Sequence, residues 1–372
     1  MSLSRWHADI SSPAVSLAKE LAKNNRVFFI EHPYSWKDVL SGNARPYNES
    51  ADQPVRVIRP PVVVPINFLP EGRLYHMLRH FNEKLLANTL RKLIADHKIA
   101  GYVFINFFDP YFFSSFEADI RPEKWVYQCM DDMSQVAYTR KHGVRLENET
   151  IRKADVVLCT SKRLTRMKSL LSPNVRFHPN AADFELFHTA YISGLERPPE
   201  LRDIPTKVIG FIGSIEYRTD FELLRKIGEQ HADKTIMMIG PVGDTKYEGH
   251  RLHELKNIRF IGARPLHSLP AYLRYFDCCI IPYKKNELTS SIYPLKINEY
   301  LAAGKPVVAT SFSDDIRAFA HVAYIAESHD EFLKLINTSI AENDVTKEAA
   351  RISVAASNSW TRRVEEFWQL IT

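Results

Sequence analysis

A polar turn and the short helix predicted after it, within residues 286–310, carry residue types suited to holding a diphosphate. The segment reads NELTSSIYPLKINEYLAAGKPVVAT, with Pro294 at the start of the helix and Gly304 at its end. These are typical boundary positions for proline and glycine. The free N–H groups of a first helical turn and the positive end of the helix dipole attract phosphate oxygens. Lys296 would add a positive charge there, and Glu299, three residues later on the same face, could accept hydrogen bonds from ribose hydroxyls.

Two adjacent carboxylates, Asp131 and Asp132, follow a predicted strand in the segment YQCMDDMS. The strand should end at about Cys129, which places both at its carboxyl end, where parallel α/β folds bind ligands. A carboxylate there can take a proton from a hydroxyl group as a general base. Because neighbouring side chains of an extended chain point in different directions, we predict Asp131 as the base and Asp132 as the second candidate. The alternative is that Asp132 caps the following helix and that neither residue does chemistry.

Two histidines lie close to predicted element ends. His7 is in the loop WHADISSP before the first helix, and His32 follows the first predicted strand in EHPYSW. Histidine changes its charge near neutral pH and can act as an acid or a base. We therefore predict a catalytic role for His7 and treat His32 as a similar candidate. The alternative for both is a structural role, which is commoner for a single histidine.

The elements that position these residues alternate between helical and strand patterns, which predicts an α/β fold with mostly parallel sheets. Helices are expected at 14–23, 73–97, 220–231, 266–276 and 294–303, and strands at 26–30, 101–107, 125–129, 155–159, 207–213, 235–240, 258–261, 278–282 and 306–310. The proline-rich and charged segment 196–205 is the predicted linker. We expect two Rossmann-like domains, 1–198 and 206–355, that face each other across a cleft. The amphipathic segment 356–372 should form a helix that crosses back to the N-terminal domain.

The segment PLKINEYLAAGKPVVAT resembles the donor-site signature of GT-B glycosyltransferases, in the branch of the teichuronic-acid-type transferases and the xanthan-pathway glucuronosyltransferase. The resemblance runs in order along most of the chain. Residues 210–220 (GFIGSIEYRTD) are similar to the first strand and glycine turn of the family's C-terminal domain. Residues 258–283 are similar to the segment whose loop holds the base. Many retaining relatives carry two glutamates eight residues apart; Glu299 matches the second, and Ser291 stands at the first position.

The resemblance implies that a sugar is transferred from a nucleotide sugar, most often a UDP-sugar, to a hydroxyl of a lipid-linked or cell-surface polysaccharide acceptor. Asp131 or Asp132 would be the base, as in the similar Asp-Asp pair of the xanthan-pathway enzyme. No metal or other cofactor is expected, because protein cations and helix dipoles stabilise the departing diphosphate. The residues expected to contact the nucleotide sugar are Gly213, Ser214, Arg218, Gly262, Ala263, Arg264, Tyr283, Ser290, Ser291, Ile292, Leu295, Lys296 and Glu299.

Two other functions remain open at this level. A non-hydrolysing UDP-sugar epimerase shares the fold, but needs more acid and base groups around the donor sugar and no acceptor surface. A non-catalytic nucleotide-sugar-binding protein would bind UDP and transfer nothing. A Rossmann dehydrogenase is disfavoured, because no G-x-G-x-x-G follows a strand.

The acceptor side is expected in the first half of the chain. Residues 71–98 carry six Lys or Arg against three Asp or Glu, with apolar residues at helical spacing. Together with the apolar stretch before it, the region 62–98 could lie on an anionic membrane or hold the diphosphate of a polyprenyl-linked acceptor. The alternative is an ordinary helix that packs its apolar stripe on the sheet. The aromatic-rich region 107–116 could contact the acceptor, or belong to the core.

Composition limits the remaining classes. A net charge of +5 fits anionic ligands or membranes, but is too weak to indicate nucleic acid as a partner. Apolar runs are strand-sized, far below the roughly 20 residues of a membrane span. The four cysteines match no zinc pattern and indicate reduced thiols, so we expect a cytoplasmic protein, peripheral at most on the inner face of the membrane. They are Cys129, Cys159, Cys278 and Cys279.

Overall fold

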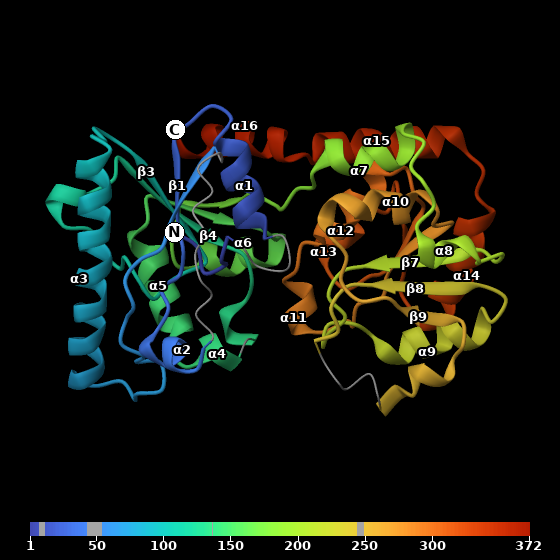
Figure 1. The fold of residues 1–372 in the computed structure, drawn as a ribbon, viewed down its shortest axis with the longest axis horizontal. Coiled ribbons are helices and arrows are strands. Elements are labelled where there is room, and N and C mark those ends of the chain that lie inside the picture. Colours follow the sequence, from blue (N-terminus) through green and yellow to red (C-terminus); the bar gives the residue numbers. More distant parts are fainter. Residues whose placement is uncertain (7–11, 43–53, 136, 244–248) are drawn as a thin grey trace. The chain divides into compact units, whose positions relative to one another are not determined.

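The computed structural model describes residues 1–6, 12–42, 54–135, 137–243 and 249–372. Contacts divide the chain into two compact units (Figure 1). Unit 1 comprises residues 1–178 and 364–372, and unit 2 comprises residues 179–363. The predicted catalytic His7 lies outside the described residues, so its role stays a prediction.

Unit 1 is built on parallel strands. The two-stranded sheet β1–β2 and the four-stranded sheet β3–β4–β5–β6 are both parallel, and Ser2 forms a bridge to Glu31 after β1 and another to Phe107 in β3. The carboxyl ends of β1, β3 and β4 therefore lie at one edge. The elements are α1 (Pro13–Leu21), β1 (Val27–Ile30), α2 (Trp36–Leu40), β2 (Val55–Ile58), α3 (Arg73–Asp96), β3 (Val103–Phe107), η1 (Ala118–Ile120), β4 (Lys124–Cys129), η2 (Met133–Gln135), α4 (Ala137–Arg140), α5 (Gly143–Lys153), β5 (Val156–Cys159), α6 (Lys162–Ser169) and β6 (Val175–Phe177).

Unit 2 holds a six-stranded parallel sheet in the order β12–β11–β10–β7–β8–β9. Its central strands are buried on both faces, as expected for parallel strands between helices. The elements are α7 (Phe184–Ile192), α8 (Pro199–Arg202), β7 (Val208–Ile212), α9 (Phe221–Gln230), β8 (Thr235–Ile239), η4 (Leu252–Glu254), β9 (Ile258–Phe260), η5 (Leu266–Ser268), α10 (Leu269–Arg274), β10 (Cys278–Ile281), α11 (Glu287–Ser290), α12 (Leu295–Ala302), β11 (Val307–Thr310), α13 (Asp314–Arg317), β12 (Tyr324–Ala326), α14 (His329–Ala341) and α15 (Val345–Ser357). The predicted α/β fold with parallel sheets in two units is confirmed.

The division between the units differs from the expected linker at 196–205. It falls after His178, and the expected linker contains the helix α8. The reason is burial: Leu201 and Ile204 belong to the core of unit 2, and α7 before them packs on α10 and α12. A segment rich in proline and charge can thus still dock through two apolar side chains.

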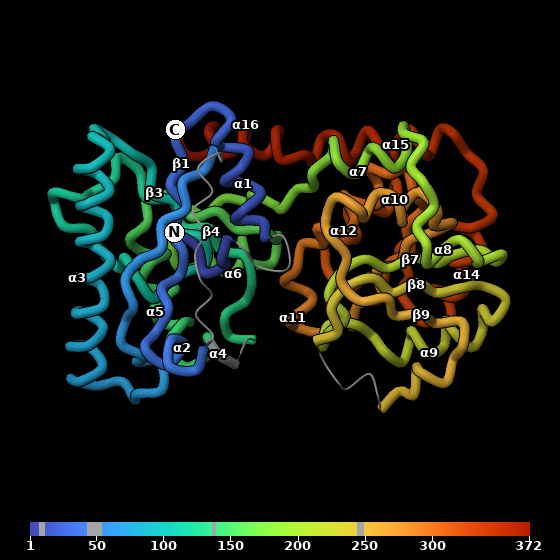
Figure 2. The backbone as a smooth tube through the Cα atoms, in the orientation of Figure 1, coloured from blue at the N-terminus to red at the C-terminus, as the bar shows by residue number. Residues whose placement is uncertain are grey.

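The last helix, α16 (Trp360–Ile371), begins in unit 2, and its residues from Val364 onward belong to unit 1 (Figure 2). Phe367 is fully buried, and its ring lies 6.1 Å from that of His178. Apolar residues on one face of this amphipathic helix provide the reason for its return to unit 1.

Candidate active site

The carboxyl edge of the unit 2 sheet is lined by glycines. Gly213 after β7, Gly240 after β8 and Gly262 after β9 all have positive φ values, of 146°, 145° and 73°. The Gly213 N–H donates to the Ile239 carbonyl (2.7 Å), and the Gly240 N–H donates to the Gly262 carbonyl (2.9 Å). A Cβ atom on Gly240 would overlap the Gly213 carbonyl. Only glycine fits this edge, so a ligand here would meet backbone rather than side chains.

Lys296 lies directly over this glycine edge. A Cβ atom on Gly213 would overlap the Cε and Nζ atoms of the Lys296 side chain. The Nζ atom is 5.7 Å from the ring centre of Phe211 and 5.9 Å from that of Tyr283. Among the described residues, none forms an ion pair or a hydrogen bond with Nζ. The cation is therefore held in place by packing and is available to an anion.

The position of Lys296 follows from the anchoring of α12. The Tyr300 hydroxyl accepts a hydrogen bond from the Ile212 N–H (2.8 Å) and donates one to the Ile212 carbonyl (3.2 Å). Lys296 is four residues before Tyr300 on the same helix face, so it reaches the residue that follows Ile212, which is Gly213. Gly304, with φ of 69°, ends the helix as predicted.

Ser290 and Ser291, two of the predicted donor contacts, lie before the N-terminus of α12. They end a separate short helix, α11, and both hydroxyls donate to the Glu287 carbonyl (2.7 and 3.5 Å). Ser291 is also almost fully buried. Pro294 is the N-cap and supplies no side-chain bond. The Ile297 N–H donates to the Pro294 carbonyl (3.2 Å), whereas the N–H groups of Leu295 and Lys296 have no backbone acceptor in the described part of the chain.

Glu299 is only partly exposed, one helical turn after Lys296. Burial raises its pKa to about 7, against the opposing effect of the Lys296 charge and with a further rise from Asp183. A carboxyl group with this pKa is partly protonated near neutral pH. It would release a proton on binding a ligand that donates hydrogen bonds to it.

The remaining predicted residues lie on loops next to this edge or pack under it. Arg218 forms an ion pair with Glu216, and the Lys284 N–H donates to the Arg218 carbonyl (2.9 Å), which joins this loop to the one after Tyr283. Tyr283 is buried, and its ring lies tilted against that of Phe312 with the ring centres 5.2 Å apart. Partly exposed at or next to the same edge are Ser214, Ser290 and Leu295, whereas Ile292 is buried.

The loop 262–264 presents its backbone. The Arg264 guanidinium is held by Glu200 (2.6 Å) and by the Tyr272 hydroxyl (3.2 Å), while Ala263 is exposed. These partners fix the orientation of the Arg264 side chain. The expected contact of this loop with a base would therefore use main-chain groups.

In unit 1, Asp132 acts as a turn cap. One of its carboxylate oxygens, Oδ1, accepts hydrogen bonds from the Ser134 N–H (3.0 Å) and from the Ser134 hydroxyl (2.7 Å), and the side chain is buried. This is the arrangement that the alternative interpretation of the sequence described. Asp131 is partly exposed at the same carboxyl end of β4, and its role as base stays a prediction.

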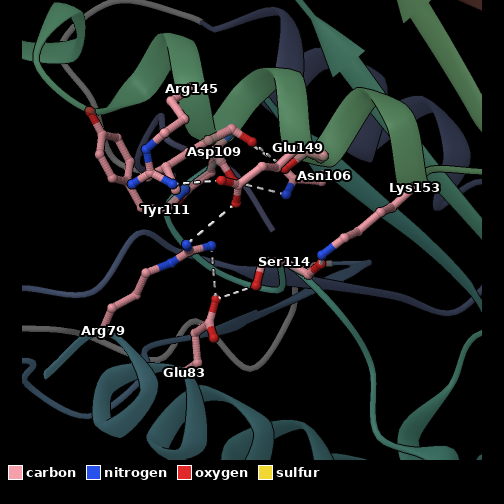
Figure 3. Close-up of polar contacts among 11 residues, drawn as sticks. Arg79, Glu83, Asn106, Asp109, Tyr111, Ser114, Arg145, Glu149 and Lys153 are labelled. Atoms are coloured by element: carbon pink, nitrogen blue, oxygen red, sulfur yellow. Dashed lines mark hydrogen bonds and ion pairs between the residues drawn. The ribbon is translucent and has the colours of Figure 1, made fainter. Parts of the chain in front are cut away.

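A hydrogen-bonded pair, His32 and Asp109, also lies at this edge of unit 1, and the sequence did not predict their contact. His32 Nδ1 lies 2.7 Å from Oδ2 of Asp109, and these residues follow β1 and β3. Figure 3 shows Asp109 beside Asn106 and Tyr111. His32 was a candidate by its place after a strand, and the same signal was present for Asp109, but nothing local links two residues 77 positions apart.

Helix α3 exposes part of its apolar stripe, which would be buried if the helix packed that stripe on the sheet. Leu74, Met77 and Phe81 are 54%, 61% and 51% exposed. The core-facing side is a different one, formed by Tyr75, Asn82, Leu86, Ala87, Leu90 and Leu93. Arg79 on this helix lies between Glu83 and Glu149 (Figure 3). Three apolar side chains on one face of α3 are thus left in contact with water.

The aromatic-rich region 107–116 belongs mainly to the core. Phe107, Phe112 and Phe113 are buried, and Phe113 stacks on Phe116 with ring centres 5.5 Å apart. The chain turns back after β3, with Phe108 and Phe113 at positive φ, and directs the buried rings inward. Acceptor contact by this region stays a prediction for its partly exposed aromatic residues, Phe108, Tyr111 and Phe116.

One pocket of about 500 Å³ lies in unit 1 between β1, β3 and α1, and none of the predicted site residues lines it. All four cysteines are buried and free. No helix in the described ranges is long and apolar enough to span a membrane.

Comparison with known proteins gives a family match in the second half of the chain. Residues 206–341 match the family model described as "Glycosyl transferases group 1". The matched residues lie within unit 2. The chain is also similar to TuaH of Bacillus subtilis (strain 168), assigned by name to teichuronic acid biosynthesis as a glycosyltransferase, with 28% identity over 237 residues. That match covers 60% of this chain and 58% of TuaH, less than two thirds of the relative's length.

Solved structures share the fold over nearly the whole chain. Sucrose-phosphate synthase from Thermosynechococcus elongatus superposes with a TM-score of 0.68 and 14% identity, covering 100% of this chain and 96% of that one. HepE of Anabaena, solved in complex with UDP and glucose, gives a TM-score of 0.66 and 15% identity, with 96% of each chain covered. The expected resemblance to GT-B glycosyltransferases is thereby confirmed for the fold.

Proposed function

We propose that the protein is a glycosyltransferase that takes its sugar from a UDP-sugar bound at the glycine edge of unit 2. The observation that carries this proposal is the placement of Lys296 over Gly213, at the N-terminus of α12, with no competing partner among the described residues. The group 1 domain over residues 206–341 and the UDP complex of HepE, a protein of the same fold, support it.

The chemistry of this edge suits a departing nucleoside diphosphate. As the bond from the sugar to the diphosphate breaks, negative charge develops on the phosphate oxygens. The Lys296 ammonium and the first N–H groups of α12 would stabilise that charge. Glu299 would bind the ribose hydroxyls, and the backbone at 262–264 would hold the base. Arg218 and the turn at 290–292 are proposed to complete the phosphate contacts.

The donor proposal is tested by ligand-induced thermal stabilisation. UDP should raise the melting temperature of the wild type more than ADP or GDP, because a ligand that binds only the folded state stabilises it. Lys296→Met should weaken UDP binding by about 10- to 100-fold, the effect expected for a lost charge-assisted contact. The matched control is Lys334→Met, an exposed lysine of α14. No stabilisation by any nucleotide would contradict the proposal.

Transfer itself is tested by incubation with UDP-sugars and hydroxyl acceptors. Release of UDP with a new glycoside is the expected result. Isomerisation of the UDP-sugar without acceptor would indicate an epimerase instead, and UDP binding without any turnover would indicate a binding protein.

For the acceptor, we propose a lipid-linked or surface glycan reached from a membrane on which unit 1 lies. The exposed stripe Leu74, Met77 and Phe81 supports this, together with Arg73 and Lys84 nearby, which are exposed and have no carboxylate partner among the described residues. Apolar side chains flanked by cations are typical of helices that lie on anionic lipid.

Vesicle co-sedimentation tests the membrane contact. The wild type should sediment with phosphatidylglycerol vesicles and less with phosphatidylcholine vesicles. The double variant Met77→Ser, Phe81→Ser should bind at least about tenfold more weakly, because it removes two apolar anchors. Leu170→Ser, at an 87% exposed leucine of unit 1, is the matched control and should bind like the wild type. Equal binding by all three proteins would contradict the proposed contact.

A further inference from the structure

Three side chains of unit 2 form a closed hydrogen-bonded triad beside the loop 262–264. One oxygen of the Glu200 carboxylate, Oε1, accepts hydrogen bonds from Nε (3.2 Å) and Nη2 (2.6 Å) of Arg264. The other oxygen, Oε2, accepts the Tyr272 hydroxyl (2.9 Å), and that hydroxyl accepts Arg264 Nε (3.2 Å). The bond from Arg264 holds the pKa of Glu200 below its ordinary value, so the carboxylate is charged at neutral pH. The guanidinium is thereby held in one orientation.

Glu200 is fixed to the core of unit 2, although it lies in the segment that the sequence predicted as a linker. It belongs to the four-residue helix α8. The next residue, Leu201, is fully buried in that core, and Ile204 is buried there as well. Arg197 donates to the Ile204 carbonyl (3.1 Å) and so closes the segment around the helix. The docking of α8 gives the triad a rigid support.

The Arg264 guanidinium also bonds to its own loop. Its Nη1 atom donates to the Ala263 carbonyl (3.0 Å), and the Gly262 carbonyl accepts the Gly240 N–H (2.9 Å). Two carbonyls of the loop are thus occupied. Within the described ranges, the N–H groups of Ala263 and Arg264 and the Arg264 carbonyl form no hydrogen bond. The loop therefore keeps two main-chain donors and one main-chain acceptor for a ligand, in an arrangement that the triad fixes.

The glycine edge leads from Lys296 to this loop. The strands β7, β8 and β9 are neighbours in this order, so the loop after β9 lies two strand spacings, roughly 10 Å, from Gly213. On the other side of β7 the edge is filled by the buried rings of Tyr283 and Phe312. A diphosphate held by Lys296 therefore finds bare backbone only in the direction of the loop 262–264. Two strand spacings suit the distance from the diphosphate to the base of an extended nucleotide.

We propose that Glu200 is a positioning residue for the nucleotide base and that it determines a preference for uracil. This inference rests on the proposed UDP-sugar site. Uracil presents its N3–H donor between two carbonyl acceptors, which complements a main-chain carbonyl flanked by N–H groups. Cytosine presents an acceptor at N3 and an amino donor in place of one carbonyl, so the same main-chain groups oppose it. Glu200 acts through the Arg264 guanidinium and the Ala263 carbonyl, and does not itself contact the ligand.

The test measures the binding of UDP, CDP and inorganic pyrophosphate to the full chain by isothermal titration calorimetry. Glu200→Gln removes the charge of the carboxylate and keeps its shape. The dissociation constant for UDP should rise about tenfold, the effect of weakened main-chain hydrogen bonds to the base. The preference for UDP over CDP should fall by a similar factor. Pyrophosphate has no base, and its dissociation constant should stay within about twofold of the wild-type value.

Pyrophosphate separates positioning from a loss of structure, because a loosened unit 2 would bind all three ligands more weakly. Lys296→Met should give the opposite pattern, with weaker binding of pyrophosphate and an unchanged ratio of UDP to CDP affinity. The matched control is Glu229→Gln, which removes the ion pair of Glu229 with Arg225 in α9 (2.8 Å) and should bind all three ligands like the wild type. Tyr272→Phe removes one hydroxyl from the triad and should lower the preference for UDP by less. It takes the place of Glu200→Gln if that variant does not fold.

Three results would overturn the role of Glu200. They are a UDP-to-CDP ratio in Glu200→Gln within about twofold of the wild-type ratio, equal weakening of UDP, CDP and pyrophosphate in that variant, and equal affinity of the wild type for UDP and CDP. In each of them the wild type still binds UDP, and the proposed donor site stands. If the wild type binds neither UDP nor pyrophosphate, the proposed function fails and the inference fails with it. The wild-type titrations therefore distinguish the two failures.

Discussion

The carboxyl edges of the two sheets are built in opposite ways. In unit 2, three adjacent strands end in glycines of positive φ, and a single cation from α12 lies over them. In unit 1, the corresponding strand ends carry side chains that bond to one another, such as the pair His32–Asp109. An edge of bare backbone suits a ligand rich in phosphate oxygens, whereas an edge of paired titratable groups suits proton transfer.

At Gly240 of the glycine edge, an added methyl group meets the backbone of Gly213, which cannot rotate away. At the edge of unit 1 a substitution removes a side-chain bond, which costs much less.

The largest effect is expected for Gly240→Ala. The new Cβ would overlap the Gly213 carbonyl, and φ is 145°. We expect the free energy of unfolding to fall by about 3 kcal/mol or more, since clash and backbone strain add. Denaturant titration measures it. The control is Gly249→Ala, where nothing lies within 4 Å of the added Cβ, and it should change stability by less than about 0.5 kcal/mol. Equal stability of Gly240→Ala and Gly249→Ala would show that position 240 does not require glycine.

Glu299→Gln should remove a pH dependence. The folded-state pKa of about 7 lies above the ordinary value of 4.5. The folded state therefore binds the proton more tightly than the unfolded state, and wild-type stability is lost as pH rises from about 4.5 through about 7. Relative to the wild type, Glu299→Gln should be unchanged at pH 4 and more stable at pH 8 by on the order of 2 kcal/mol. If the free energies of unfolding of the wild type and Glu299→Gln ran parallel from pH 4 to pH 8, the raised pKa of Glu299 would be contradicted.

Tyr300→Phe tests the anchor that places Lys296. It leaves the buried Ile212 N–H without its acceptor, and should lower the free energy of unfolding by about 1–2 kcal/mol. It should also weaken UDP binding, because α12 loses its fixed position against β7. Tyr191→Phe, at an exposed tyrosine of α7, is the control for the loss of a hydroxyl. Unchanged stability in Tyr300→Phe would show that the Tyr300 hydroxyl does not anchor α12.

The smallest effect is expected in unit 1, for Asp132→Ala. Loss of the bonds to Ser134 should cost about 1 kcal/mol, as for other lost caps. Ser134→Ala should cost a similar amount, and the double variant should lose little more than either single one, because they share one interaction. Additive losses in thermal unfolding would show that Asp132 has another role.

Local sequence predicted the elements well where apolar runs are long. The strands β7 to β11 and the helices α3, α9 and α12 lie within one residue of the expected ranges at each end, whereas the edge strand β12 was not predicted. Burial on both faces and glycine or proline at the ends leave strong local signals. The segment 196–205 failed as a linker because two apolar residues in it, Leu201 and Ile204, docked on a core that local composition does not reveal.

By itself, the sequence determined where several elements begin and end, through the glycines after the strands and through Pro294 and Gly304 around α12. It also determined the spacing of Lys296 and Glu299. Only the tertiary structure decided that Lys296 covers Gly213, that Asp132 is a cap, and that His32 meets Asp109. These are contacts between residues distant in sequence or choices among rotamers, and periodicity carries no information on them. They follow from the order and register of parallel strands, which bring the ends of different strands to one edge.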